Sequence, residues 1–527
     1  MISAYDVARQ TFSILLPEIL LLITATAMIT AGAFVKLPRH SWCATAAVAL
    51  GVALLVLLGM GSQSTDIYSA VALNDAFSWY GRLLFLLSGL VLVALAHDQV
   101  DDSRAAEFFG ALLFINAGAM LVAASNELVF LFVGLELVSI PTYLLLYLSR
   151  RSKDTQEAAT KYFFLSLFSS GLLLFGFAYL YGLTGVTNLK ALAFLADKVP
   201  GVPQPQLALI AIVFVVAGLG FRVAAVPFHF YAPDVYQGSP TVIAAMLSWV
   251  PKAVGFLALL RTVTAVVSAA GTSGPLGHRA VLLAWLIAAI TMTLGNTVAL
   301  AQENLKRLFA YSSIAHAGYL MIGIAVAFRN DLNSGGLYYG AEGIFFYLTA
   351  YAMMTLGAFG VIVMLSSPAH PVEKVEDLAG LSRTHPASAL AMAVCLFSLA
   401  GIPPLAGFWG KFELFAAAFS ASPGEDSSLF WWLGVIAVLN SAAGAYYYLR
   451  IVVTMYLRNP TADAITTRPA WPSALAVALC SLGTVFVGLY PIPVIVQTRL
   501  AAEASIDLPL PVVMANPGAI AALPAPR

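Results

Sequence analysis

Apolar runs of about 20 residues recur along almost the whole chain, and they restrict what it can fold into. A helix needs about 20 apolar residues to cross the hydrocarbon core of a bilayer. The connections between the runs are too short to form a separate domain. The sequence therefore predicts an all-α polytopic membrane protein with about fourteen transmembrane helices. These spans are expected near residues 14–35, 42–60, 77–96, 106–124, 127–148, 161–183, 207–230, 240–268, 279–300, 306–328, 338–365, 387–420, 429–457 and 470–496.

The composition agrees with this fold class. Hydrophobic residues make up 60% of the 527 positions and charged residues only 10%, whereas a soluble domain has about 25% charged residues. The net charge of zero gives no electrostatic reason to expect nucleic acid as a partner. The lipid bilayer is the expected environment, and the apolar run 14–34 is long enough to be the first span instead of a cleavable signal.

No pattern in the chain indicates a bound cofactor or metal. Cys43, Cys395 and Cys480 lie far apart in apolar runs, without CxxC or Cys/His spacing. Neither a GxGxxG turn nor a phosphate-binding loop occurs in the sequence. We expect the three cysteines to act as small buried hydrophobic residues and this chain to bind no cofactor or metal.

Lysine and arginine are unevenly distributed between the two sets of predicted loops. Loops after odd-numbered spans carry fourteen of them, with the densest cluster at 150–161, whereas the other loops and both termini carry nine. The second set includes Arg82, Lys190 and Arg261. Cytoplasmic loops are the richer ones, so both termini are expected on the non-cytoplasmic side. The last 30 residues, rich in alanine and proline, are expected to lie loosely on the surface.

Four charged residues fall inside the apolar runs: Glu136, Arg222, Lys252 and Lys411. One charge near the bilayer centre costs about 2.5–3.5 kcal/mol, so four cost roughly 10–14 kcal/mol unless they face one another or water. They could be static ion pairs that hold helices together. They could equally form an ion or proton relay, which needs acid, base and cation along the midplane, and we favour the relay.

Proline and glycine predict that two spans are broken close to these charges. Arg222 and His229 are seven residues apart, a spacing that puts two side chains on nearly the same helix face, and Pro227 lies between them. In the twelfth span, residues 401–404 read Gly-Ile-Pro-Pro and interrupt the helix shortly before Lys411.

Broken helices at corresponding positions of two halves indicate a translocation site built on inverted repeats. Spans 4–8 and 9–13 would be the two five-helix units. The expected segments are 1–100 for the first three helices, 101–270 and 271–460 for the two repeats, and 461–527 for the last helix and tail.

Several other ionisable residues in or near the spans have two interpretations. His229 and His316 are the only histidines well inside spans, and each could be a hydrogen-bonding core residue or a proton carrier. Glu127 is expected to be an interfacial carboxylate at the mouth of its span. The roles of Glu18 and Glu342, near span ends, stay open.

Three stretches carry a resemblance to a known family. They are GLGFRVAAVPFHFYAPDVYQGSPT at 218–241, NLKRLFAYSSIAHAGYL at 304–320 and SLAGIPPLAGFWGKF at 398–412. They resemble signatures of subunit N of the proton-pumping NADH:quinone oxidoreductase, respiratory complex I. The related subunits L and M and the antiporter subunits of sodium/proton exchangers contain stretches similar to the latter two. They generally lack the motif APDVYQGSPT. The likeness extends over nearly the whole chain.

The resemblance implies roles for individual residues. Glu136, in VGLELVSIP, matches a fifth-helix glutamate that modulates a neighbouring basic residue. Lys252, in SWVPKAVGF, matches the central eighth-helix lysine, and Lys411 matches the twelfth-helix lysine regarded as the link to the exit side. His229 matches a histidine on the path between helices seven and eight.

One position departs from the family pattern, because Arg222 stands where the seventh helix usually has lysine. Arginine, with a pKa above 12, is a fixed cation, whereas a buried lysine can lose its proton. Arg222 is therefore expected to pair with Glu136, and proton loading would fall to Lys252 with His229 as a helper. Alternatively, this version couples conformation without passing a proton through the first half-channel.

By this resemblance, the chain is a non-redox, proton-translocating subunit of a translocase in the bacterial inner membrane. NADH, FMN, iron–sulfur clusters and quinone would be bound by the rest of the complex. The expected partners are membrane-arm subunits resembling K, M, J and A. Two alternatives remain open: a subunit of a multisubunit cation/proton antiporter or ion-pumping membrane hydrogenase, and a structural membrane subunit whose charges are static pairs.

Overall fold

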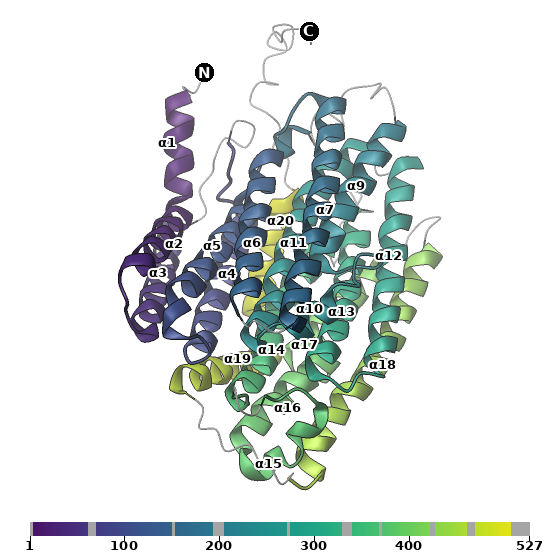
Figure 1. The fold of residues 1–527 in the computed structure, drawn as a ribbon. Coiled ribbons are helices and arrows are strands. Elements are labelled where there is room, and N and C mark those ends of the chain that lie inside the picture. The colour runs from purple at the N-terminus through teal and green to yellow at the C-terminus, as the bar shows by residue number, and fades with distance from the viewer. Residues whose placement is uncertain are drawn as a thin grey trace, which may run out of the picture.

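The computed structural model describes residues 4–61, 70–149, 153–192, 205–270, 275–328, 340–367, 371–421, 427–460 and 470–506. These residues form a bundle of helices, and the described part of the chain has isolated β-bridges but no strand (Figure 1). The expected loose tail beyond Ile506 and residues 150–152 of the expected basic cluster lie outside the described residues.

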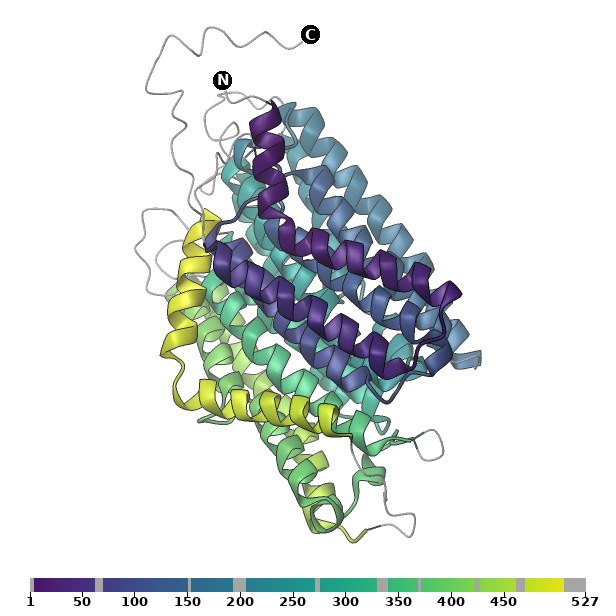
Figure 2. The same ribbon diagram turned by 90° about the vertical axis from the view of Figure 1, so that its left-hand side faces the viewer.

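Four helices precede the two five-helix units and stand along one flank of the bundle (Figure 2). They are α1 (Ala4–Ile14), α2 (Leu16–Phe34), α3 (Arg39–Met60) and α4 (Ala76–Ala96), and a short 3₁₀ turn, η1 (Asp102–Arg104), follows them. Asp75 caps α4 because its carboxylate accepts a hydrogen bond from the Ser78 backbone N–H.

The first unit contains α5 (Ala105–Ala124), α6 (Leu128–Ser149), α7 (Lys153–Thr184), α9 (Pro205–Val223), α10 (Ala232–Gly238) and α11 (Thr241–Ala270). The second contains α12 (Pro275–Ala299), α13 (Leu305–Ala327), α14 (Gly340–Leu365), η2 (Val375–Leu378), α15 (Leu381–Thr384), α16 (Pro386–Ala400), α17 (Ala406–Ser420) and α18 (Ser427–Leu457). Two further helices end the described chain, α19 (Trp471–Leu489) and α20 (Ile492–Ile506).

Each of the fourteen predicted spans corresponds to a helix of the described residues. Twelve helices in that part of the chain are long and apolar enough to cross a membrane, and two shorter apolar helices, Leu207–Val223 and Pro386–Ala400, lie at the other two positions. These two short helices are the first halves of the spans that we expected to be broken. The chain is thus an all-α polytopic membrane protein.

Both breaks have the same local backbone geometry. After α9, Ala224 has a φ of 57° and the Val226–Pro227 bond is cis; after α16, Gly401 has a φ of 88° and the Pro403–Pro404 bond is cis. Gly401 follows Ala224 by 177 positions (401 − 224). The same separation recurs at Gly118 and Gly295, where an added Cβ would lie 2.9 Å from the Gly134 carbonyl and 2.5 Å from the Ala315 amide respectively. The two units therefore repeat their close helix contacts as well as their breaks.

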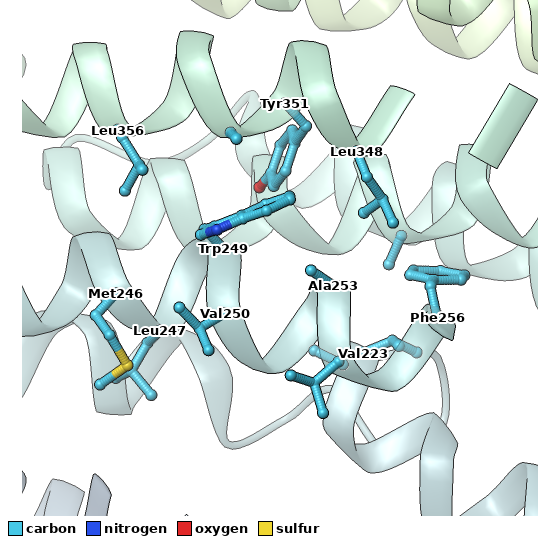
Figure 3. Packing of buried hydrophobic residues seen from close by; sticks show 14 of the residues in the cluster. Val223, Met246, Leu247, Trp249, Val250, Ala253, Phe256, Leu348, Tyr351 and Leu356 are labelled. Atoms are coloured by element: carbon cyan, nitrogen blue, oxygen red, sulfur yellow. The ribbon is translucent and has the colours of Figure 1, made fainter. Parts of the chain in front are cut away.

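Helix α11 forms the centre of the bundle, since every residue from 242 to 262 is buried. Trp249 of α11 lies next to Tyr351 of α14, and Val223, at the end of α9, lies beside α11 near Ala253 and Phe256 (Figure 3). A proline at 251 removes one backbone N–H from the helix just before Lys252. The central helix thus carries a charged residue at a point where its own hydrogen-bond ladder is interrupted.

The end of the chain differs from the expectation of a loose surface tail from residue 498 onward. Up to Ile506 it is helical, because the predicted last span divides at Tyr490–Pro491 into α19 and α20. Thr498, Ala501 and Ala502 are completely buried. Helix α20 packs against α14 and α4, and both last helices flank the bundle (Figure 2). Small alanine side chains carry little hydropathy, but they allow this close packing.

Two arginines that we assigned to loops are buried in helices. Arg82 on α4 is completely buried, and its Nε and Nη2 bind the two carboxylate oxygens of Glu18 on α2, each at 2.6 Å. Arg261 on α11 binds both carboxylate oxygens of Asp75, each at 2.9 Å. The loop assignment was wrong because both arginines lie within helices and each is neutralised by a carboxylate from another part of the chain, which the sequence around it does not reveal.

Candidate functional site

The first candidate charges form an ion pair between α6 and α9. Arg222 Nη2 lies 2.9 Å from Glu136 Oε1, and Ser170 on α7 donates its hydroxyl to the same oxygen at 2.5 Å. Arg222 Nη1 also donates to the Leu135 carbonyl at 3.3 Å. Arg222 is buried, whereas the Glu136 side chain is 23% exposed. The predicted pairing of these two residues is confirmed.

Lys252 has no such partner. It is 2% exposed, and its ammonium donates to the backbone carbonyl and the hydroxyl of Ser313 on α13, the latter at 2.6 Å. It also donates to the Tyr351 hydroxyl at 3.3 Å and lies 4.6 Å from the centre of that ring. No described carboxylate lies within ion-pair distance of Lys252.

Lys411 is held by the second helix break. It is 4% exposed, and its ammonium donates to the Ala400 carbonyl and the Ser441 hydroxyl, both at 2.9 Å. Because α16 ends at Ala400, this carbonyl is free to accept a bond from a side chain. The ammonium also lies 5.2 Å from the centre of the Tyr319 ring. In the described chain Lys411, like Lys252, has no carboxylate partner.

His316, whose role the sequence left open, lies between the two lysines. Its Nδ1 is hydrogen-bonded to the Tyr347 hydroxyl, and its Nε2 to the Tyr448 hydroxyl at 2.8 Å. The imidazole centre is 5.2 Å from the Tyr351 ring, which Lys252 contacts, and 5.7 Å from the Tyr319 ring, which Lys411 contacts. The histidine is thus the central member of a row of polar groups.

The tyrosines of this row were not predicted as site residues. Tyr347 and Tyr351 are one turn apart on α14 and stack on each other, so they share one helix face. Tyr448 comes from α18, on the far side of His316, and is also bonded to Ser312. The i,i+4 spacing on α14 could have been noticed in the sequence, but the meeting of three helices at His316 could not.

His229 stands apart from the other candidates. It follows the break after α9, so the seven-residue helical spacing from Arg222 does not hold, and the expected shared helix face is wrong. Among the described residues, no hydrogen bond joins His229 to Arg222 or Lys252.

Asp234, on the short helix α10 beyond this break, connects the two units. Its carboxylate oxygens lie 2.7 Å from Lys161 Nζ on α7 and 2.7 Å from Arg307 Nη1 on α13. Burial alone would raise the pKa of the Asp234 carboxyl, but the hydrogen bonds and charges of these two cations prevail and lower it. Glu127 instead accepts a hydrogen bond from the Phe130 backbone N–H at the start of α6, in line with an interfacial role.

The sequence and fold place this chain among known proteins. Residues 125–457 match the model of the family described as NADH:quinone oxidoreductase/Mrp antiporter, TM. The chain belongs to this family. It is 38% identical over 485 residues to NADH-quinone oxidoreductase subunit N of Trichlorobacter lovleyi, covering 91% of this chain and 94% of that protein. The same-named protein of Paramagnetospirillum magneticum is 35% identical over 493 residues, with 93% and 96% covered.

Solved structures agree. A chain of respiratory complex I from Thermus thermophilus has 33% identity and a TM-score of 0.74, with 92% of this chain and 99% of that chain covered. A chain of the Mrp complex from Dietzia shares the fold at 21% identity, a TM-score of 0.76, and coverage of 93% and 98%. The resemblance drawn from the three signature stretches is therefore confirmed.

Proposed function

We propose that Lys252, His316 and Lys411 carry protons through this membrane-arm subunit of a proton-translocating NADH:quinone oxidoreductase. Membership of the family and the subunit N relatives support this type of subunit, and make it part of an enzyme complex, a translocase. The observation that carries the residue assignment is that two deeply buried lysines lack a carboxylate partner in the described chain, yet both touch the row of polar side chains around His316.

The alternative of static ion pairs fits Glu136 and Arg222 but not the lysines. A charged group near the bilayer centre costs about 2.5–3.5 kcal/mol, and an ammonium without a counter-ion regains little of that cost. Unlike arginine, lysine can give up its proton in such a place. Lys252 and Lys411 are therefore suited to binding and releasing protons, whereas Arg222 is a fixed cation.

The Glu136–Arg222 pair would control this exchange. At an effective dielectric constant of about 20, a pair of charges 2.9 Å apart interacts by about 6 kcal/mol, and at roughly 6 Å by about 3 kcal/mol. A movement of a few ångströms in this pair would thus change its own interaction energy by about 3 kcal/mol, and the separated charges would then change the electrostatic potential at Lys252. His229, at the break between α9 and α10, would assist proton uptake.

Localisation, partners and cofactors belong to the same proposal. The chain would lie in the bacterial inner membrane with both termini on the non-cytoplasmic side, beside membrane-arm subunits resembling K, M, J and A. NADH, FMN, iron–sulfur clusters and quinone would be bound elsewhere in the complex. The Thermus complex I chain supports partners of this kind.

The test uses the complete complex in membrane vesicles, with Lys252→Ala and Lys411→Ala. Both variants should assemble into the band that stains for NADH dehydrogenase on a native gel, but lose most coupled quinone reduction and proton pumping. Lys306→Ala is the matched control, because Lys306 is also buried but donates to the Ser239 carbonyl, away from the row. Full pumping in either site variant would contradict the assignment. Sodium flux without NADH activity would favour the antiporter alternative.

A further inference from the structure

A second group of buried carboxylates lies outside the row of lysines and tyrosines. Glu342, in the first turn of α14, is 2% exposed, and Glu413, on α17, is 6% exposed. Carboxylates so deeply buried in a membrane domain are rare and usually functional. The sequence left Glu342 without a role, and Glu413 went unnoticed because it follows Lys411 by only two residues.

The two carboxylates come from helices that pack very closely. At Gly343, an added Cβ would lie 3.1 Å from the Leu414 side chain and 3.5 Å from the Glu413 backbone, so α14 and α17 approach each other there. Glu342 directly precedes Gly343, so this contact brings its helix turn beside Glu413. One oxygen of Glu342, Oε2, is buried and has no hydrogen-bond partner in the described structure.

Arg499, on α20, is the cation paired with Glu342. Its Nε lies 3.5 Å from Glu342 Oε1, and its side chain is 50% exposed. If both glutamates were ionised, one guanidinium would leave a buried negative charge uncompensated, and the exposed Glu503 nearby would add to the repulsion. A proton on one of the two glutamates removes this cost.

The contact between Arg499 and Glu342 differs from the static ion pair between Arg82 and Glu18. Arg82 binds both oxygens of that carboxylate at 2.6 Å, and both side chains are fully buried. Arg499 makes a single, longer contact from a half-exposed position. The first geometry locks two helices together, whereas the second leaves the arginine free to approach or leave without breaking a buried network.

The other helices packed against α17 add no charge that competes for these glutamates. Helices α16 and α19 contain no Asp, Glu, Lys or Arg, and the single such residue of α18, Arg450, binds the Leu300 and Gln302 carbonyls. On α13, Lys306 and Arg307 are bound to the α10 region. On α17 itself, Lys411 points to Ala400 and Ser441.

The contact between α14 and α17 also includes a member of the row of polar groups around His316. Tyr347, which is bonded to His316, packs across Gly410, where an added Cβ would lie 2.4 Å from the tyrosine ring. Glu413 is three residues further along α17, on the same helix face as Gly410. Tyr347 thus packs on the face of α17 that carries Glu413, and Glu342 on the same α14 is paired with the half-exposed Arg499.

We propose that Glu413 and Glu342 form the release station of the path, where one of the two carboxyl groups carries the proton and Arg499 of α20 drives it out. The proposal rests on the proton path proposed above. In the release step, the O–H bond of the carboxylic acid breaks, the proton passes to water beside α20, and Arg499 moves in to balance the carboxylate left behind. Reprotonation from the side of His316 moves the arginine away again.

The test uses the whole complex in vesicles, with Glu413→Gln, Glu342→Gln and Arg499→Gln, and Glu373→Gln as an exposed glutamate control. Infrared difference spectra should show the band of a protonated carboxyl group in the wild type and in the control. Glu413→Gln or Glu342→Gln should remove that band and reduce pumping at least fivefold. Arg499→Gln should keep the band but slow pumping and make its rate respond more steeply to pH on the release side.

The outcomes separate this inference from the proposed path. Loss of pumping in Lys252→Ala together with wild-type pumping and an unchanged infrared band in both glutamate variants would overturn the release station and leave the path intact. Wild-type pumping in all of these variants would overturn the path itself. If the glutamate variants do not assemble, Arg499→Gln decides: an unchanged rate and pH profile in that half-exposed variant would overturn the inference.

Discussion

Replacing Lys252 by methionine tests whether the buried charge of Lys252 serves proton transfer or holds helices together. The side chain stays unbranched, becomes one atom shorter and loses its charge. Removing an ammonium near the bilayer centre recovers about 2.5–3.5 kcal/mol of insertion cost. Losing the three hydrogen bonds, to the carbonyl and the hydroxyl of Ser313 and to the Tyr351 hydroxyl, costs about 0.5–1.5 kcal/mol each, or about 1.5–4.5 kcal/mol together. The net change in stability should therefore lie within about 2 kcal/mol of zero.

A lysine that held helices together through an ion pair would behave differently. Removing one member of a buried pair costs about 3–5 kcal/mol. Arg82→Met is the matched control, because Arg82 is equally buried and is paired with Glu18. We expect Lys252→Met to reach normal amounts of assembled complex with near wild-type thermal stability but without coupled pumping, and Arg82→Met to lose assembly. A strongly destabilised Lys252→Met, or one that pumps normally, would refute this reasoning.

Three further predictions concern other contacts. Arg222→Lys should keep quinone reduction within a few fold of wild type because it preserves a cation beside the carboxylate, whereas Arg222→Gln should lose most of it; equal activities of the two would show that the cation is dispensable. Asp234→Asn should lower thermal stability at pH 7 by about 0.5–1 kcal/mol per half-exposed pair. Because the carboxyl pKa is lowered in the folded protein, this contribution is present above about pH 4 and lost as the pH falls further, so melting curves of wild type and variant should converge in acid. Gly318→Ala would place a Cβ 2.4 Å from the Met292 amide and should destabilise the complex by about 1–3 kcal/mol, whereas Gly51→Ala, with open space around it, should be neutral or slightly stabilising in the same thermal assay.

Those parts of the fold that the bilayer dictates were predictable from the sequence. Span length follows from membrane thickness, so the apolar runs predicted where the helices lie. Proline and glycine predicted the two breaks, which begin at Ala224 and Gly401. The Glu136–Arg222 pair was also predicted, since two opposite charges inside spans are costly unless they meet.

The remaining features depend on contacts between helices distant in sequence. The burial of Arg261 depends on its ion pair with Asp75, which lies 186 positions earlier in the sequence. The place of His316 depends on tyrosines from two other helices, which no spacing within its own helix reveals. Helix α20 was missed because alanine contributes little hydropathy while packing well, so burial there follows from shape and not from apolar content.

The two units carry different residues at matching positions, and on the proposed path this difference would set the direction of proton transfer. The two breaks are 177 positions apart. When the first unit is shifted by this number, Glu136 falls on Ser313 (136 + 177) and Asp234 falls on Lys411 (234 + 177). An acid in one half thus stands where the other half has the hydroxyl that holds Lys252, and a surface-paired acid stands where the other half has a buried lysine. A duplicated scaffold with identical side chains would work equally well from either end. On the proposed path, the helices would supply two similar half-passages, and the exchanged side chains would decide which one loads a proton and which one releases it.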